Sequence, residues 1–245
     1  MNRKKRILIA PLNWGLGHAS RCIPIIERFR VRGADVVLAA DGRPYDFLKN
    51  EFPDAELHRL RDINITYPDS SSMLGAMLRQ LPQLLSTYRN ERAVSARLIA
   101  DLKIDGIVSD NRFGLFSGGI PCIYMTHQIS IMPPRLFAWS EPVLRRVHAA
   151  LISRYTECWI PDSPGEINLS GALSHGIPLP SNAQFIGPLS RLHPADVPIR
   201  YDCAVVLSGP EPQRTIFESI ILRQIEKLPV RAIVIQGIPG VNASS

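Results

Sequence analysis

The first residues suited to chemistry follow a short apolar run, in the stretch PLNWGLGHASR that begins at Pro11. Gly15 and Gly17 permit a tight turn and a close approach of the backbone to a ligand. The helix N-terminus expected after them favours an anion or a hydroxyl ligand. His18 would then lie at the carboxyl end of the first strand, which is the edge where open α/β sheets bind ligands.

A carboxylate is expected beside His18. The run Gly106–Ser109 is typical of a buried strand, and Asp110 follows it directly. In a doubly wound sheet of order 3-2-1-4-5 these two strands are neighbours, so His18 and Asp110 would face one crevice. A carboxylate on one imidazole nitrogen fixes the tautomer and supports the imidazolium that forms when the other nitrogen takes a proton. The pair predicts a general base that activates a hydroxyl nucleophile; the alternative is that each residue caps a helix or holds a loop.

Other side chains at this edge leave more than one interpretation open. His127 ends the next strand and either contacts the acceptor substrate or belongs to a structural loop. Asp41 ends the second strand, where a dinucleotide-binding domain carries its ribose-binding carboxylate. Ser20, however, stands where the third glycine of that fingerprint belongs, so an NAD(P) site is the weaker alternative. The histidines show no spacing typical of metal ligands, and we expect no metal site.

A second candidate site lies near the end of the chain, in the stretch LSGPEPQRT over Leu207–Thr215. It falls between an expected strand and an expected helix. Ser208 and Gly209 can present backbone amides there, and Arg214 adds positive charge near the helix start. This layout predicts a phosphate-binding turn without the Gly-Lys-Ser/Thr of a Walker loop. A plain helix cap is the alternative.

Short β-branched runs alternate with helical patterns along most of the chain, which is typical of a parallel sheet covered by helices. The expected strands are Arg6–Ala10, Asp35–Ala40, Glu56–Leu60, Gly106–Ser109, Pro121–Thr126, Glu157–Pro161 and Ala183–Gly187.

Two long helices are expected between these strands. The first runs from about Ala19 to Arg32, because its apolar residues recur at helical spacing and Gly33 ends it. The second covers Ser70 to Leu102, where Pro82 should kink or split it. Its Met/Leu stripe is interpreted as core packing, and contact with a membrane surface is the alternative.

A change of composition divides the chain. The stretch 188–201 is rich in proline and polar residues, which is typical of a linker between an N-terminal domain, 1–187, and a second α/β region, 202–245. One βαβ unit cannot bury both faces of its sheet, so we expect the second region to begin an incomplete domain of a longer protein. Its expected elements are strand Cys203–Leu207, helix Gln213–Lys227 and strand Arg231–Ile235.

Composition excludes several classes of protein. With 45% hydrophobic and 20% charged residues among 245, the chain is globular and not disordered. Its net charge of +6 fits an anionic ligand or membrane surface. Nucleic acid is not an expected partner, because the basic residues are scattered. No apolar run approaches the roughly 18–20 residues of a membrane span. The cysteines are far apart in apolar runs, so we expect buried free thiols and a reducing, cytoplasmic location: Cys22, Cys122, Cys158 and Cys203.

Taken together, several short motifs resemble those of bacterial proteins related to family 28 glycosyltransferases. They also resemble, more distantly, the lipid-linked muropeptide N-acetylglucosaminyltransferase. The resemblance spans most of the chain in the right order. It is carried by PLNWGLGHASRCIPII, IVSDNRFG, MTHQ, CWIPDS followed by NLSGALSHG, FIGPLSR and VLSGPEPQRT.

This resemblance implies a GT-B architecture, with two Rossmann-like doubly wound domains facing a cleft. It implies an inverting transfer of a sugar from a nucleotide sugar, UDP-linked, to a hydroxyl acceptor, with no metal or other cofactor. His18 matches the basic histidine of such enzymes and Asp110 its partner. The acceptor side would include Gly15, Gly17, Asn111 and His127. The donor side would include Ser208, Gly209, Arg214 and Thr215.

Alternatives within this resemblance stay open. The ribose-binding part of the donor site would lie beyond Ser245, so the chain is expected to hold an acceptor half and only the start of a donor half. A sugar-nucleotide epimerase and a non-catalytic binding module are the rival functions. A lipid-linked acceptor and peripheral contact with the inner face of the membrane are compatible with the basic charge.

Overall fold

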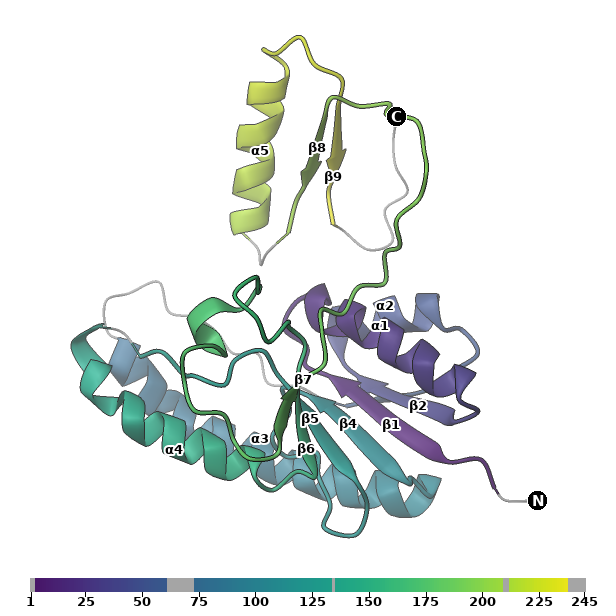
Figure 1. Cartoon of the computed structure of the whole chain (residues 1–245), viewed down its shortest axis with the longest axis vertical. Coiled ribbons are helices and arrows are strands. Elements are labelled where there is room, and N and C mark those ends of the chain that lie inside the picture. The colour runs from purple at the N-terminus through teal and green to yellow at the C-terminus, as the bar shows by residue number, and fades with distance from the viewer. Residues whose placement is uncertain (1–2, 61–72, 134, 209–211, 238–245) are drawn as a thin grey trace. The chain divides into compact units, whose positions relative to one another are not determined.

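The computed structural model describes residues 3–60, 73–133, 135–208 and 212–237 (Figure 1). The chain divides into two compact units, Met1–Arg191 and Leu192–Ser245. The domain limits expected from the sequence stay predictions. Within the described ranges, no helix combines the length and the apolar character needed to cross a membrane.

The first unit is built on a seven-stranded parallel sheet in the order β3-β2-β1-β4-β5-β6-β7. The predicted order 3-2-1-4-5 is confirmed, and β6 and β7 extend it. Every predicted strand forms, with ends that differ by at most two residues. The strands are β1 (Arg6–Pro11), β2 (Asp35–Ala40), β3 (Glu56–Arg59), β4 (Gly106–Asp110), β5 (Cys122–Met125), β6 (Glu157–Ile160) and β7 (Ala183–Phe185).

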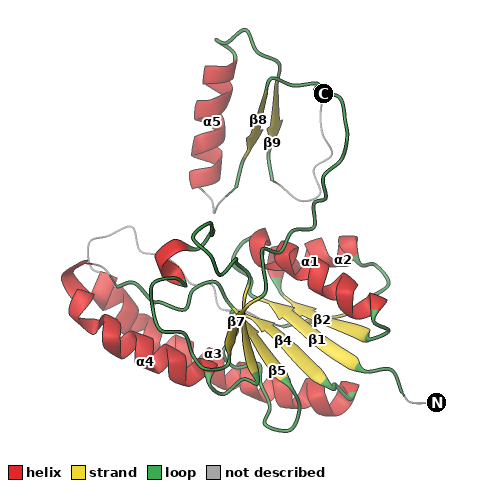
Figure 2. Ribbon diagram, viewed as in Figure 1, coloured by secondary structure: helices red, strands yellow, loops and turns green. Residues whose placement is uncertain are grey.

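Helices cover both faces of this sheet (Figure 2). Successive side chains of a strand point to opposite faces, and in β1 Leu8, Ile9 and Ala10 are all buried. Ile9 packs in the cluster formed with α1 (Leu16–Val31) and α2 (Gly42–Glu51). Leu8 and Ala10 belong to the opposite cluster, which includes residues of α3 (Met73–Leu102) and α4 (Glu141–Ile152). Burial on both faces explains why these strands are continuously apolar.

The helices differ from the expectations in three respects. First, α1 begins at Leu16, so His18 lies inside its first turn. Second, α3 is one helix of 30 residues and is not split at Pro82. Third, α2 and α4 were not predicted. The side chains of the Met/Leu stripe up to position 85 and residues 70–72 lie outside the described residues, so its interpretation as core packing stays a prediction.

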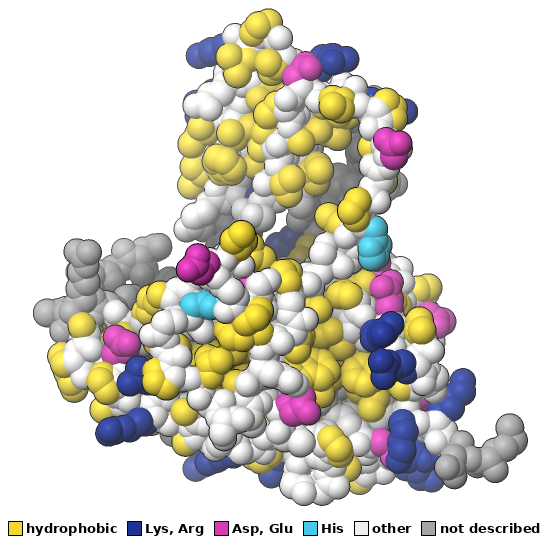
Figure 3. Space-filling view, in the orientation of Figure 1, with side chains coloured by type: hydrophobic (Ala, Val, Ile, Leu, Met, Phe, Trp, Pro, Cys, Tyr) yellow, Lys and Arg dark blue, Asp and Glu magenta, His cyan; other side chains and the backbone are white. Residues whose placement is uncertain are grey.

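The second unit contains β8 (Cys203–Val206), α5 (Gln213–Ile225) and β9 (Ala232–Ile235). Its two strands pair in parallel. Such a small unit covers little of its own apolar surface, and Figure 3 shows hydrophobic side chains across its visible face. Exposed hydrophobic residues of this unit include Val206, Ile216, Phe217, Ile220, Leu222, Leu228, Val230 and Ile235.

One expectation about the cysteines is wrong. Cys22, Cys122 and Cys158 are buried free thiols, but Cys203 is exposed. The three buried thiols lie in α1, β5 and β6, within the core of the large sheet. Cys203 lies in β8, whose two-stranded sheet with a single helix leaves its side chain uncovered.

Candidate functional site

The candidate site forms where the end of β4 meets the start of α1. Pro11 of β1 is opposite Asp110 of β4 in the parallel register, and the chain turns from there into α1. His18 Nδ1 lies 3.0 Å from Asp110 Oδ1. Asp110 is fully buried, and His18 is 8% exposed. The structure thus brings together the two side chains that the strand order places at one edge, while their catalytic roles stay a prediction.

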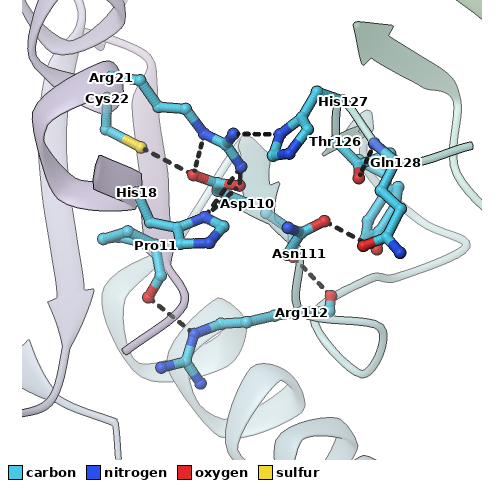
Figure 4. Close-up of polar contacts among 12 residues, drawn as sticks. Pro11, His18, Arg21, Cys22, Asp110, Asn111, Arg112, Thr126, His127 and Gln128 are labelled. Carbon is cyan, nitrogen blue, oxygen red and sulfur yellow. Dashed lines mark hydrogen bonds and ion pairs between the residues drawn. The ribbon is translucent and has the colours of Figure 1, made fainter. Parts of the chain in front are cut away.

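A third residue, Arg21, binds both members of this pair and was missed by the sequence analysis (Figure 4). Its Nε donates to Asp110 Oδ2 at 2.8 Å, and its Nη2 forms an ion pair with Asp110 Oδ1. The same Nη2 lies 2.8 Å from His18 Nδ1. The spacing of the two residues could have indicated Arg21, because it follows His18 by three positions and residues three apart on a helix share a face.

These contacts set the charge at the site. Burial alone would raise the pKa of the Asp110 carboxyl, but the hydrogen bonds and charges of His18 and Arg21 hold that pKa below its ordinary value. Burial would lower the pKa of Arg21, but Asp110 raises it above its ordinary value. Asp110 and Arg21 therefore form a buried ion pair of opposite full charges. The Cys22 thiol, 3.9 Å from Asp110 Oδ2, has its pKa raised by burial and by Asp110, so it stays a neutral donor.

The loop after β4 is held by a second buried ion pair. Arg112 donates from Nε to the Pro11 carbonyl at 2.9 Å and from Nη1 to Glu91 Oε1 at 3.0 Å. Glu91 Oε2 also accepts from the backbone of Gly114 at 2.9 Å. These bonds connect the end of β1, helix α3 and the loop after β4. They fix the position from which Asp110 faces His18.

Gly15 and Gly17, both predicted for the acceptor side, lie where β1 leads into α1. Gly15 caps α1 with φ 77° and ψ 175°, a conformation essentially restricted to glycine. Gly17 lies inside the helix with no such requirement. A Cβ on either residue would meet no atom within 4 Å, so the space beside this turn is open.

The side chain of Asn111 forms a structural hydrogen bond in the loop after β4. It has φ 57°, in the left-handed region that asparagine tolerates. Its Oδ1 accepts a hydrogen bond from the Tyr124 hydroxyl at 3.3 Å, and its backbone N–H donates to the Met125 carbonyl at 3.1 Å. An acceptor-binding role for Asn111 stays a prediction.

His127 lies two residues beyond β5 and faces Arg21, whose Nη1 is 2.8 Å from its Nδ1. Burial lowers the pKa of His127, and its electrostatic interactions with Arg21 and His18 lower that pKa further. The imidazole is therefore neutral at pH 7. It borders a cavity of about 290 Å³, lined by Arg21, His127, Pro161, Asp162, Leu169, Ser170, Pro188 and Leu189.

Asp162, two residues beyond the end of β6, holds the loop that forms one wall of this cavity. Its carboxylate accepts from the backbone N–H groups of Ser163 at 2.8 Å, Leu169 at 3.0 Å and Ser170 at 2.8 Å. Burial would raise the pKa of Asp162, but these hydrogen bonds hold it well below its ordinary value. Asp162 is therefore ionised at neutral pH and anchors the loop.

The predicted donor-side residues lie in the second unit. Ser208 and Thr215 are exposed, and Gly209 lies outside the described residues. Arg214 is 5% exposed, and its guanidinium pairs with Glu218 at 3.1 Å and donates to the Gln236 carbonyl at 3.2 Å. A role for Arg214 in diphosphate binding stays a prediction. In that role the guanidinium would have to bind the diphosphate in addition to Glu218 and the Gln236 carbonyl.

Comparison with known proteins supports the fold. No family model and no curated protein matches the sequence. Among solved structures, the glycotransferase of kitacinnamycin is 16% identical, with TM-score 0.53 over 98% of this chain and 72% of that one. Spinosyn rhamnosyltransferase SpnG is 14% identical, with TM-score 0.55 over 94% and 64%. Acinetobacter baumannii MurG is 11% identical, with TM-score 0.48 over 95% and 57%.

The chain thus spans 57% to 72% of the length of these three proteins. At such low identities the similarity concerns the fold alone. The doubly wound parallel sheet, the helices on both faces and this similarity lead to one conclusion: the chain has the Rossmann-like α/β fold of the GT-B glycosyltransferases, over part of their length.

Proposed function

We propose that this chain is part of an inverting glycosyltransferase that moves a sugar from a UDP-sugar to a hydroxyl group of an acceptor. The observation that carries the proposal is the His18–Asp110 pair at the carboxyl edge of the sheet, where open α/β folds bind ligands. The fold shared with two glycosyltransferases supports the same class of reaction by analogy.

The proposal uses Nε2, the second ring nitrogen of His18. Its Nδ1 contacts Asp110 and Arg21, whereas no described residue forms a hydrogen bond with its Nε2. In the described part of the chain, the buried side-chain nitrogen and oxygen atoms without a partner are Ser95 Oγ and Asn182 Oδ1. Nε2 is therefore not fully enclosed, although the residue as a whole is only 8% exposed, and the proposal has the acceptor hydroxyl approach this nitrogen. This is the geometry that a general base requires.

In the proposed step, His18 Nε2 takes the proton of the acceptor hydroxyl while Nδ1–H donates to Asp110 Oδ1. Arg21 Nη2 then donates to Asp110 Oδ1, with which it forms an ion pair, and not to His18 Nδ1. The acceptor oxygen forms a bond to the anomeric carbon from the face opposite the diphosphate. The bond from that carbon to the diphosphate oxygen breaks, and UDP leaves with the electron pair. Asp110 is already ionised, so it stabilises the imidazolium as the proton arrives.

The proposal assigns the donor side to the second unit. Ser208 precedes α5, and Thr215 lies in its first turn, where backbone N–H groups and the helix dipole favour a diphosphate. This arrangement meets the charge of the leaving group without a metal ion. The proposal places the reaction in the cytoplasm, and it applies equally to a soluble and a lipid-linked acceptor.

The test measures UDP release by the complete transferase of which this chain is proposed to be part. The donors are UDP-glucose and UDP-N-acetylglucosamine, each with and without hexyl glucoside as the hydroxyl acceptor. We expect acceptor-dependent release that falls about 10²–10⁴-fold in His18→Gln, because a positioned base contributes about that factor. His58→Gln is the matched control, since His58 lies on edge strand β3 and contacts Glu56.

Three outcomes would contradict the proposal. Equal UDP release by wild type and His18→Gln would show that His18 is not the general base. Conversion of the UDP-sugar to an isomer without acceptor would indicate an epimerase. Binding of the UDP-sugar without any UDP release would indicate a binding module.

A further inference from the structure

Arg21 contacts His18, Asp110 and His127, which lie at the edge formed by β4, β5 and α1. Its guanidinium is 14% exposed. Nε and Nη2 bind the two oxygens of Asp110, and Nη1 lies 2.8 Å from His127 Nδ1. Nη2 also lies 2.8 Å from His18 Nδ1. Each guanidinium nitrogen thus has a partner in this cluster (Figure 4).

The contact with His127 fixes the tautomer of that imidazole. A guanidinium nitrogen can only donate, so Nδ1 of His127 must accept with its lone pair. The proton of the neutral ring is then on Nε2. No described residue forms a hydrogen bond with that nitrogen, which is not fully enclosed, and His127 lines the cavity, so the nitrogen is available to a ligand there. His127 therefore presents a single N–H donor.

The charges around His127 keep it in this neutral form. Arg21 and His18 of α1 disfavour the imidazolium, whereas Asp110 at the end of β4 and Asp162 after β6 favour it. Neither carboxylate is free to act as a close partner. Asp110 is paired with Arg21, and Asp162 accepts from three backbone N–H groups of its loop.

We infer that Arg21 is a positioning residue: it clamps Asp110 toward His18, and it holds His127 as an uncharged N–H donor at the cavity. The role given to Asp110 rests on the function proposed above, whereas the tautomer of His127 does not depend on it. Arg21 is thus a structural link between the group that holds the base and the group that contacts a ligand.

The arrangement also defines the ligand chemistry of the cavity. The positive charge of Arg21 is used by Asp110, and the other walls include apolar groups of Pro161, Leu169 and Leu189. The remaining polar wall residues, Asp162 and Ser170, are bonded to each other. One neutral donor beside apolar groups then fits an uncharged oxygen, such as that of a hydroxyl or ether on an apolar body. It does not fit a phosphate, which would need an unpaired cation.

The experiment uses the full chain labelled with ¹⁵N-histidine, because the ¹⁵N shifts of the two ring nitrogens report which one carries the proton. In the wild type we expect His127 to carry it on Nε2. In Arg21→Met we expect a mixture of tautomers and a higher pKa of His127, since a neighbouring positive charge is removed. Hexyl glucoside should shift the His127 signals of the wild type saturably, and inorganic phosphate should not.

Two controls separate positioning from general damage. Arg30→Met removes another arginine of α1, one that pairs with Asp54 and stacks on Phe52, and it should leave His127 unchanged. His148 is buried and bonded to the Ile129 carbonyl, so its signals report whether the core stays native. If Arg21→Met does not fold, Arg21→Lys keeps a cation for Asp110 but cannot span to His127.

A wild-type His127 with its proton on Nδ1 would overturn the inference without any variant. Unchanged His127 signals in a folded Arg21→Met or Arg21→Lys would overturn it as well, as would saturable binding of inorganic phosphate at His127. Failure of the proposed transferase reaction is a separate result: UDP release independent of His18 would leave the tautomer and its dependence on Arg21 intact.

Discussion

At the scale of single residues, Asp110 combines complete burial with full ionisation. The cost of burying its charge is offset by two partners, because one oxygen faces His18 and both contact Arg21. Removal of the carboxylate charge leaves the Arg21 guanidinium in the site without its opposite charge. The free energy of unfolding should therefore depend on Asp110 in a way that varies with pH.

We expect Asp110→Asn to lower the free energy of unfolding at pH 7 by about 3–5 kcal/mol, the usual cost of breaking a buried ion pair. The pKa of Asp110 is lower in the folded state, so its contribution is present above the unfolded value of about 3.9 and is lost as pH falls below it. Urea denaturation of both proteins from pH 7 to pH 3 measures this. The difference between them should shrink at acid pH, and a constant difference would contradict the prediction. Asp162 also has a lowered pKa, but it is present in both proteins, so its contribution to the pH dependence cancels in the difference.

Gly15 and Gly17 form a matched pair for the turn before His18. Neither has an atom within 4 Å of an added Cβ, but only Gly15 has positive φ. Gly15→Ala should cost about 1–3 kcal/mol through backbone strain. Gly17→Ala should stabilise by up to about 1 kcal/mol, because alanine is the better helix former. Thermal unfolding of both variants measures whether each is less or more stable than the wild type. Equal changes in stability would contradict the start of α1 between Gly15 and Gly17.

At the scale of elements, the loop after β4 is packed closely against α3. An added Cβ on Gly114 would lie 2.4 Å from the Glu91 Cβ and 2.8 Å from the Tyr88 carbonyl oxygen. Glu91 is in turn bound to Arg112 and to the Gly114 backbone. Any displacement here therefore disturbs the bonds that locate the end of β4, which carries Asp110.

We expect Gly114→Ala to lower the free energy of unfolding by about 1–3 kcal/mol, the usual cost of overpacking. Gly118→Ala is the control in the same loop region, since a Cβ there meets no atom within 4 Å. Urea denaturation compares the two. A Gly114→Ala variant as stable as Gly118→Ala would show that α3 and the loop separate more easily than their packing indicates.

At the scale of the whole molecule, the chain consists of two compact units of very different size. The first buries two extensive clusters on the two faces of its sheet. The second has two strands and one helix, and many of its apolar side chains are exposed. Residues 192–201 are exposed and form no helix or strand. This stretch should therefore be the first to admit a protease.

We expect limited trypsin digestion to cut first after Arg200, in this exposed stretch. Arg191 is the nearest alternative, but it pairs with Glu51 and stacks on Phe47, which holds the backbone there. Mass spectrometry of the first fragments identifies the cut. Initial cleavage within α1 or α4 would contradict the prediction, because it would require the large unit to open first.

Much of the fold could be predicted because its signal is local. Each strand of the large sheet is a short apolar run, and burial on both faces makes that run continuous. The two missed helices begin with breaker residues: α2 contains Gly42 and Pro44 in its first turn, and α4 has Pro142 there. Proline is compatible with a first helical turn, so these residues start helices where the pattern suggests loops.

The amino-acid sequence by itself determined the strands, their order and the edge at which His18 and Asp110 meet, because apolar periodicity and the connection rules of parallel sheets are read along the chain. Only the tertiary structure decided the partners: Arg21 between Asp110 and His127, and Glu91 with Arg112. These bonds join residues 21 to 106 positions apart. The only local signal is the three-residue spacing of His18 and Arg21, which does not identify the distant partners. Their geometry depends on how helices pack across the sheet, which the folded chain alone specifies.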